Sequence, residues 1–304
     1  MRPIYILGVG QTPVSKETDL SIRQLAAGAV RAALADAGIE HVGALYLGNM
    51  LSGMLSQQQH LGALVADAAG LRGVEAATAE AACSSGAAAM RWGVMAVASG
   101  LHDVVVVAGV EKMTHTDRYA TTRALATASD WDSEGAKGYN FVSLNAVLMQ
   151  EYIQRYRINR SLFAPFAINA HRNALGNPNA LFHKEIDAMV YEQSKVVHDP
   201  VRLYDASPIC NGAAALVLAA GDAVGKATAG RPAVALPTAW ASPTAATGWC
   251  WTASCSPVAA PMPRLGLARR RWTSSSCTTP TPSCRCCRWR GPALPGRARG
   301  CGWG

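Results

Sequence analysis

The chain has 304 residues, half of them hydrophobic, and carries 28 Lys and Arg against 20 Asp and Glu. This length and apolar fraction indicate a globular protein with one large core or two modest ones. No apolar run reaches the roughly 20 residues of a membrane helix, and no small-residue cleavage pattern follows the apolar run after Arg2. These features exclude the membrane and export classes, so we expect a soluble cytoplasmic protein.

The net charge of +8 is concentrated at one end of the chain. Residues 1–226 carry a net charge of −2, whereas residues 227–304 hold ten Arg, no Lys and no acidic residue. Seven of the nine Cys and six of the eight Trp also lie beyond residue 234, and all seven His lie before residue 199. The composition therefore changes abruptly near residue 230.

The first 230 residues alternate between strand and helix patterns. Residues 5–10 form a short apolar run that ends in glycine, and residues 44–50 form a second apolar run, which predicts two strands. Between them, Ser21 is the predicted N-cap of a helix whose apolar residues recur at helical spacing over residues 22–33. Gly38 is placed to end this helix.

The alternation continues with a predicted helix at residues 61–69 and a β-branched run at residues 103–109, typical of a strand that is covered on both faces. Residues 116–204 have the pattern of longer, more polar helices, which we interpret as an insertion. Residues 207–221 return to small, apolar residues. This order predicts a layered α/β domain with a largely parallel sheet.

The sequence GVGQTP has a glycine pattern that could suggest a dinucleotide-binding loop. Gly8 and Gly10 follow a predicted strand, but Pro13 stands where the third glycine of such a loop is needed for close helix packing. We therefore do not expect a nicotinamide or flavin cofactor site.

Cys83 is the candidate nucleophile. It follows a run of small residues and precedes Ser-Ser-Gly-Ala-Ala-Ala, which predicts the start of a helix. The free N–H groups and the positive dipole end of a helix stabilise a thiolate, the reactive form of cysteine. The alternative is that Cys83 is a small buried hydrophobe among alanines.

Six motifs occur in a fixed order along the first 230 residues: VGQTP (9–13), LGNMLSG (47–53), EAACSSGAAA (80–89), AGVEKMT (108–114), NAHRNALGNPNALF (169–182) and SPICNGAAALVLA (207–219). In this order they resemble the thiolase superfamily, in the branch of acetyl-CoA acetyltransferases close to the sterol-carrier and archaeal thiolases. The resemblance implies a layered α/β/α core with an inserted loop domain that covers bound CoA.

The resemblance also implies a Claisen-type acyl transfer. Cys83 stands where the family's nucleophile takes an acyl group from acyl-CoA as a thioester, and a carbanion from a second thioester, or CoA itself, then removes the acyl group. It implies CoA thioesters as substrates, no other cofactor and no metal. It further implies a homo-oligomer and, in this branch, a small zinc-containing OB-fold partner. His171, in the insertion, is assigned no catalytic role.

Four segments follow from this interpretation. Residues 1–115 form the N-terminal core, residues 116–204 the loop domain, and residues 205–234 the return to the core. Residues 235–304 form an unstructured tail where the family has its second core. That second core supplies the family's oxyanion-hole motif, its activating Gly-His-Pro histidine and a second cysteine, and none of these motifs occurs in this chain.

The tail allows three interpretations. A zinc site could use Cys284 with Cys287 and Cys250 with Cys255, but the spacing is irregular and no hairpin pattern surrounds either pair. A basic nucleic-acid segment is the second interpretation, although the tail holds no lysine. Neither is favoured, and we predict no nucleic-acid partner.

The third interpretation, which we favour, is translation in a displaced reading frame. Tryptophan has one codon, so reading the last base of each codon with the first two of the next turns Trp249, Cys250 and Trp251 into Val-Leu-Asp. Between Ser275 and Cys287 the same displacement allows His-Asp-Ala followed by an aromatic residue, this branch's form of the oxyanion-hole motif. The tail residues then need no function.

Two other functions stay open. A β-ketoacyl synthase-like condensing enzyme would share the layered fold and the cysteine nucleophile, although the EKMT motif and the long insertion favour a thiolase. A non-catalytic, thiolase-like partner subunit is the alternative from a different class. With its second core lost, we expect the chain to have little activity and an exposed apolar face that favours aggregation.

Overall fold

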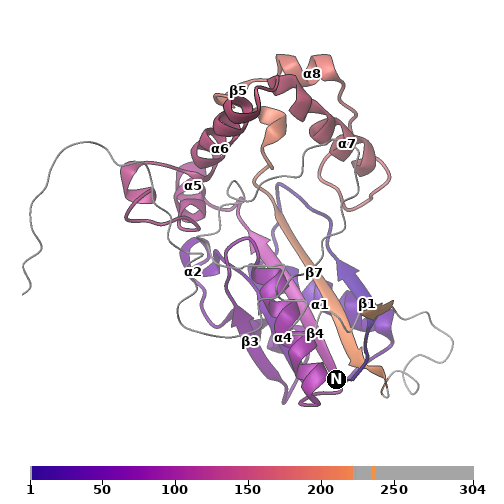
Figure 1. The fold of residues 1–304 in the computed structure, drawn as a ribbon. Helices are drawn as coiled ribbons and strands as arrows, with labels where there is room; N and C mark the ends of the chain where they lie inside the picture. Colours follow the sequence, from indigo (N-terminus) through magenta and orange to yellow (C-terminus); the bar gives the residue numbers. More distant parts are fainter. Residues whose placement is uncertain (1, 222, 224–233, 237–304) are drawn as a thin grey trace, which may run out of the picture. The chain divides into compact units, whose positions relative to one another are not determined.

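The computed structural model describes residues 2–221, 223 and 234–236. Its main feature is a six-stranded sheet in the order β3-β2-β4-β7-β1-β8 (Figure 1). The strands are β1 (Ile4–Gln11), β2 (Ala44–Gly48), β3 (Glu75–Ala79), β4 (Val104–Lys112), β7 (Asn211–Ala220) and β8 (Val234–Leu236). The helices of this part of the chain are α1 (Ile22–Ala37), α2 (Ser52–Leu55), α3 (Leu61–Ala69) and α4 (Ser85–Ser99).

Helices cover both faces of the sheet. Helices α1 and α3 share one apolar core with Leu45 and Leu47, whereas α4 shares a second core with Tyr46. Because successive side chains of a strand point to opposite faces, β2 contributes to both cores in alternation. Figure 1 shows α4 in front of the sheet and α1 behind it. The predicted α/β/α layering is confirmed.

Helix α1 begins and ends where the sequence predicts. The Ser21 Oγ accepts a hydrogen bond from the Gln24 backbone N–H, and the Gln24 side chain accepts one from the Ser21 N–H at 2.9 Å. This reciprocal pair satisfies donors that a helix start leaves free. Gly38 ends the helix with a φ of 67°, a left-handed conformation that glycine adopts without steric cost.

The glycines of GVGQTP serve the packing of β1 on α1. A Cβ atom at Gly8 would lie 2.4 Å from the Ala33 carbonyl oxygen, and one at Gly10 would lie 2.2 Å from the Ala29 carbonyl oxygen. Only a residue without a Cβ allows the strand and the helix backbone to approach this closely. Both glycines lie inside strand β1.

The sheet is mixed, so the prediction of a largely parallel sheet is wrong. Strand β2 pairs in parallel with β3 and β4, but β7 runs antiparallel to β4 and β1, and β8 runs antiparallel to β1. Lys112 at the end of β4 pairs with Asn211 at the start of β7. The chain therefore leaves and re-enters the sheet at the same end, and β7 has to run in the opposite direction.

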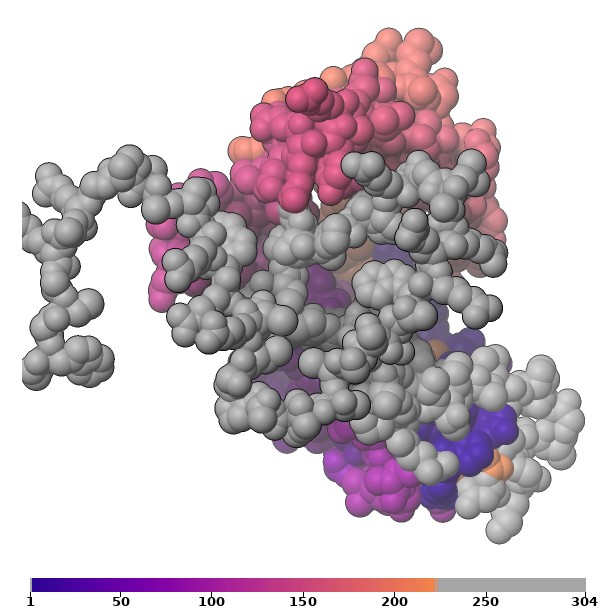
Figure 2. All heavy atoms as spheres, viewed as in Figure 1, coloured from indigo at the N-terminus to yellow at the C-terminus, as the bar shows by residue number. Residues whose placement is uncertain are grey.

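The segment between β4 and β7 is mainly helical. It holds α5 (Arg118–Ala126), α6 (Phe141–Tyr156), α7 (Ala164–Ala174), α8 (Ala188–Gln193), β5 (Val196–His198) and β6 (Val201–Arg202). Tyr191 of α8 is fully buried; its hydroxyl donates to the Asp205 carboxylate and accepts from the Arg160 guanidinium. In Figure 2 this segment carries the pink to salmon colours. Helices were expected here, while the boundaries at residues 115 and 204 stay predictions.

The chain after β7 is described only in part. Ala235 and Leu236, which the sequence assigned to the tail, lie in β8. The rest of the predicted unstructured tail, residues 237–304, and with it the rejected zinc site, lies outside the described residues. Among the residues that the structure describes, no helix is long and apolar enough to cross a membrane.

Candidate active site

Cys83 lies in the turn between β3 and α4. Strand β3 ends at Ala79 and α4 begins at Ser85, so Cys83 stands immediately before the N-cap residue Ser84. A helix does follow Cys83, as predicted. The cysteine side chain is exposed, which contradicts the alternative that it is a small buried hydrophobe.

Hydrogen bonds from side chains hold this turn in a strained backbone conformation. The Ser85 hydroxyl donates to the Ala82 carbonyl oxygen at 2.6 Å and accepts from the Ala81 N–H at 3.0 Å. The Glu80 carboxylate accepts from the Ala82 N–H at 2.6 Å. Ala82 has a φ of 48°, a left-handed conformation that costs roughly 1–2 kcal/mol for a residue with a Cβ. Strain of this kind, held by surrounding bonds, is typical of functional sites.

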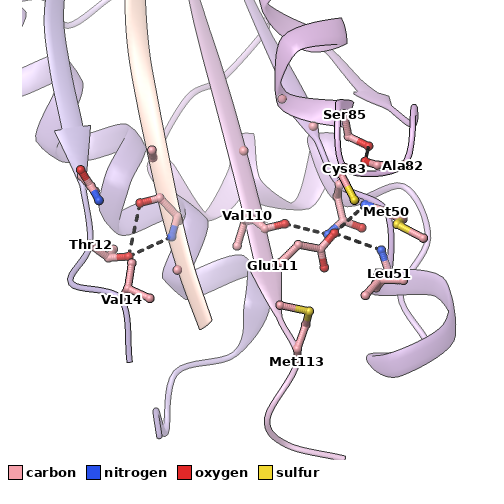
Figure 3. A pocket seen from close by; sticks show the side chains of 18 of the residues that line it. Thr12, Val14, Met50, Leu51, Ala82, Cys83, Ser85, Val110, Glu111 and Met113 are labelled. Carbon is pink, nitrogen blue, oxygen red and sulfur yellow. Dashed lines mark hydrogen bonds between the residues drawn. The ribbon is translucent and has the colours of Figure 1, made fainter. Parts of the chain in front are cut away.

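Cys83 lines a pocket of about 400 Å³. The pocket lies at the ends of β1, β2 and β4 and at the start of β7, and Figure 3 shows Cys83 and Glu111 among its lining side chains. In open α/β sheets, ligands bind in the crevice outside the carboxyl ends of the strands. Of the described residues that line the pocket, Cys83 and Glu111 are the two with titratable side chains.

A close contact between β2 and α4 sets the position of Cys83 beside the sheet. A Cβ atom at Gly48, the last residue of β2, would lie 2.4 Å from the backbone nitrogen of Gly86 and 2.5 Å from the Ser85 carbonyl oxygen. Both neighbours are backbone atoms of the first turn of α4, so they cannot move aside by a change of side-chain rotamer. Glycine at this position therefore allows the turn that carries Cys83 to sit directly against the strand end.

Glu111 near the end of β4 is a partly buried carboxyl group at the pocket. Its Oε1 accepts from the Met50 N–H at 2.6 Å and from the Leu51 N–H at 3.1 Å. Its buried Oε2 has no hydrogen-bond partner in the part of the chain that the structure describes. Burial raises the pKa of Glu111 above its ordinary value, although the backbone bonds act in the opposite direction. Glu111 belongs to the EKMT motif, in which the sequence alone indicates no role for it.

Two further residues with reactive side chain types, His171 and Cys210, lie outside the lining of this pocket. The ring of His171 stacks on Phe182 with centroids 5.9 Å apart, and its Nδ1 lies 2.8 Å from the Lys184 carbonyl oxygen. The second described cysteine, Cys210, is half-buried, and burial raises the pKa of its thiol.

This arrangement can support nucleophilic chemistry at an exposed thiol. The pocket offers Cys83, one carboxyl group and apolar walls, and no histidine lines it within the described residues. Groups of three or more His, Cys, Asp or Glu that could hold a metal ion are also absent from the described ranges. A histidine that activates the thiol would therefore have to come from outside this lining.

Comparison with known families agrees with this architecture. The family profile described as the thiolase N-terminal domain matches residues 4–222. The chain belongs to the thiolase family. The matched range runs from the start of β1 to just past the end of β7, so it contains the whole pocket and the Cys83 turn.

Two curated thiolase relatives are acetyl-CoA acetyltransferases. That of Methanothermobacter thermautotrophicus is 42% identical over 224 residues, covering 73% of this chain and 58% of the relative. That of Methanocaldococcus jannaschii is 38% identical over 220 residues, covering 72% of this chain and 56% of the relative. The chain thus spans less than two thirds of the length of these relatives. The resemblance stated from the sequence motifs is confirmed.

Solved structures share the fold of this thiolase chain. An Ltp2-ChsH2(DUF35) aldolase superposes with a TM-score of 0.61 at 23% sequence identity, covering 72% of this chain and 56% of that chain. At this identity the likeness concerns the fold alone.

Proposed function

We propose that this thiolase chain carries the nucleophile of an acyltransferase that moves acyl groups between CoA thioesters through a thioester on Cys83. One observation carries the proposal: the exposed thiol of Cys83 lines a pocket at the carboxyl ends of the strands. The similarity to acetyl-CoA acetyltransferases supports CoA thioesters as substrates.

In the first step the Cys83 thiolate attacks the carbonyl carbon of acyl-CoA. The carbon–sulfur bond to CoA breaks, CoA leaves as a thiolate that takes up a proton, and the acyl group stays on Cys83. In the second step CoA, or a carbanion formed from a second thioester by removal of a proton, attacks the acyl carbon and frees the cysteine. No cofactor besides the CoA of the substrates is part of this proposal.

The proposal includes an impaired activity. Positioned acid–base groups and oxyanion donors each contribute about 10²- to 10⁴-fold to such reactions. The sequence beyond residue 230 contains no histidine and none of the motifs that would supply these groups. The displaced reading frame accounts for their loss.

The assembly is also a proposal. We infer a homo-oligomer and an accessory zinc-containing OB-fold partner, and we place the chain in the cytoplasm in connection with acyl-CoA and lipid metabolism. The name of the Ltp2-ChsH2(DUF35) aldolase joins two components, which supports a two-component assembly.

The experiment is to incubate the full chain with acetyl-CoA and to follow the tryptic peptide from Gly73 to Arg91, whose one cysteine is Cys83, by mass spectrometry. We expect one hydroxylamine-sensitive acetyl group on this peptide and none in Cys83→Ala. The absence of an adduct would reject Cys83 as the nucleophile and favour a non-catalytic subunit. A normal turnover rate in an acetoacetyl-CoA cleavage assay would instead contradict the proposal that the activity is impaired.

A further inference from the structure

The thioester chemistry above gives no role to Glu111, which lines the same pocket as Cys83. We propose that Glu111 is a positioning residue whose carboxyl group fixes the pocket wall formed by Met50 and Leu51 and thereby limits the length of the acyl group that can reach Cys83. This inference rests on the proposed acyl transfer and deepens it, because it names the residue that sets the size of the acyl site.

The contacts of the Met50–Leu51 wall support this role. Both backbone N–H groups donate to the same oxygen, Glu111 Oε1, at 2.6 and 3.1 Å. They stand just before α2, whose N-cap residue Leu51 makes no side-chain capping bond. Free N–H groups at a helix start need an acceptor, and Glu111 supplies it from about 60 residues further along the chain. An ionised acceptor makes such bonds roughly twice as strong as a neutral one.

A second side chain fixes the neighbouring residues but not the wall itself. The Asn49 amide donates to the Val110 carbonyl oxygen at 2.8 Å and accepts from the Ser52 N–H at 2.9 Å. These bonds hold residues 49 and 52 on either side of the wall. Within the described residues, Glu111 is the side chain that accepts from the two N–H groups between them.

The wall is continuous with the rest of the apolar lining. Leu51 is buried in a small cluster with Leu55 and Ala124, and the partly buried Met50, Met113 and Leu125 pack against this cluster. Four of these residues also line the pocket: Met50, Leu51, Met113 and Leu125. Release of the wall would therefore displace the cluster that bounds the pocket between α2 and α5.

The second oxygen of Glu111 indicates that this residue positions the pocket wall and is not present only to stabilise the fold. Glu111 Oε2 is buried without a partner, and Glu111 forms no ion pair among the described residues. A buried, unsatisfied carboxyl oxygen is unfavourable, so this residue is a poor choice for stability alone. A buried polar atom without a partner is an exception to the rules of stable folding, and such exceptions are expected at functional sites.

The test uses two isosteric variants and a probe that needs no catalysis. Glu111→Met keeps the approximate volume but cannot accept the two N–H bonds, whereas Glu111→Gln keeps an acceptor. Methyl, butyl and octyl methanethiosulfonate react with Cys83 by attack of the thiolate on the sulfenyl sulfur, which forms a mixed disulfide and releases methanesulfinate. The rates are followed on the peptide from Gly73 to Arg91 in the full chain.

We expect wild type and Glu111→Gln to react faster with the methyl than with the octyl reagent by the same ratio. In Glu111→Met this ratio should fall on the order of tenfold, the scale at which hydrophobic pockets discriminate a methylene group. Val217→Ala, a buried change in β7 outside the pocket, should keep the wild-type ratio while lowering stability. An unchanged ratio in Glu111→Met, or the same fall in Glu111→Gln or Val217→Ala, would overturn the proposal.

The two proposals fail independently. If Cys83 forms no acetyl thioester but the ratio falls in Glu111→Met as expected, the acyl transfer is rejected while the positioning of the wall stands. If the thioester forms and the ratio does not change, the role of Glu111 is rejected alone.

Discussion

Glu111 and Glu75 show how surroundings decide the response of a carboxyl group to pH. Burial raises the pKa of Glu111. Glu75 at the start of β3 lies 2.9 Å from His102 Nε2 and accepts from the Tyr46 hydroxyl at 3.0 Å, and the hydrogen bond with His102 is the main cause of its lowered pKa. Burial, the hydrogen bond to Glu75 and the negative charge of Glu75 in turn raise the pKa of Tyr46 to about 12. The two carboxyl groups therefore affect stability in opposite directions.

We predict that Glu111→Gln changes the pH dependence of stability. A raised pKa contributes stability below the ordinary value of 4.5 that is lost as pH rises through the folded value. The free energy of unfolding of Glu111→Gln relative to wild type should therefore increase between about pH 4 and about pH 7.5. Urea unfolding of both proteins across this range measures it.

Glu75→Gln serves as the control of opposite sign. The lowered pKa of Glu75 contributes stability above its ordinary value of 4.5 that is lost as pH falls through the folded value. This variant should thus lose stability relative to wild type as pH rises, by a small amount because Glu75 is exposed to solvent. Parallel curves for Glu111→Gln and wild type would contradict the assignment.

Of the two titratable residues that line the pocket, the sequence indicated Cys83 and not Glu111. Cys83 was found because small residues and a helix start form a local pattern. Glu111 was missed because Glu-Lys after an apolar run is the ordinary pattern of a strand that reaches solvent. Its partners, the N–H groups of Met50 and Leu51, lie about 60 residues away, and no local pattern contains them.

Among the elements, the close contact between β2 and α4 holds the turn that carries Cys83 against the sheet. We predict that Gly48→Ala lowers the free energy of unfolding by about 1–3 kcal/mol, the usual cost of overpacking. Its Cβ would meet backbone atoms of Ser85 and Gly86 at 2.4–2.5 Å. The displaced turn should also change the alkylation rate of Cys83, which can be measured with iodoacetamide.

The matched control is Gly28→Ala in α1, where a Cβ meets nothing within 4 Å. Because alanine favours helix over glycine, this variant should gain about 0.5–1 kcal/mol and leave the alkylation rate of Cys83 unchanged. Equal stability of Gly48→Ala and wild type would show that the strand and the helix can separate at no cost.

The elements differ in how far the sequence could predict them. Helix α1 was predictable to its caps, since Ser21 and Gly38 encode both ends locally. Strand β3, with the sequence EAATA, was missed because it lacks β-branched runs and owes its conformation to parallel pairing with β2. The direction of β7 was also missed, because direction depends on where the preceding insertion returns the chain.

For the whole molecule, the displaced reading frame that we predict from the sequence would make the tail dispensable for folding. We predict that a chain ending at Leu236 keeps its thermal midpoint within about 3 °C, since a change in stability below about 1 kcal/mol shifts the midpoint by no more than that. Differential scanning calorimetry of both chains measures this. A larger fall would mean that residues 237–304 contribute to the fold.

The same truncation tests the alternative that the arginine-rich tail binds nucleic acid. That function requires salt-sensitive binding in the full chain that disappears in the shorter one. The DNA sequence around codon 234 distinguishes a displaced frame from an uninterrupted one.

The place of β7 has a consequence for the order in which this protein can acquire its structure. Residues 211–220 fill the centre of the sheet between β4 and β1, partners that lie about 100 and 210 residues earlier in the chain. Such distant pairings give a high contact order and slow folding. On the ribosome, β1 to β4 must wait without their central neighbour until residues 211–220 have been made, and during that interval their open edges are a target for chaperones.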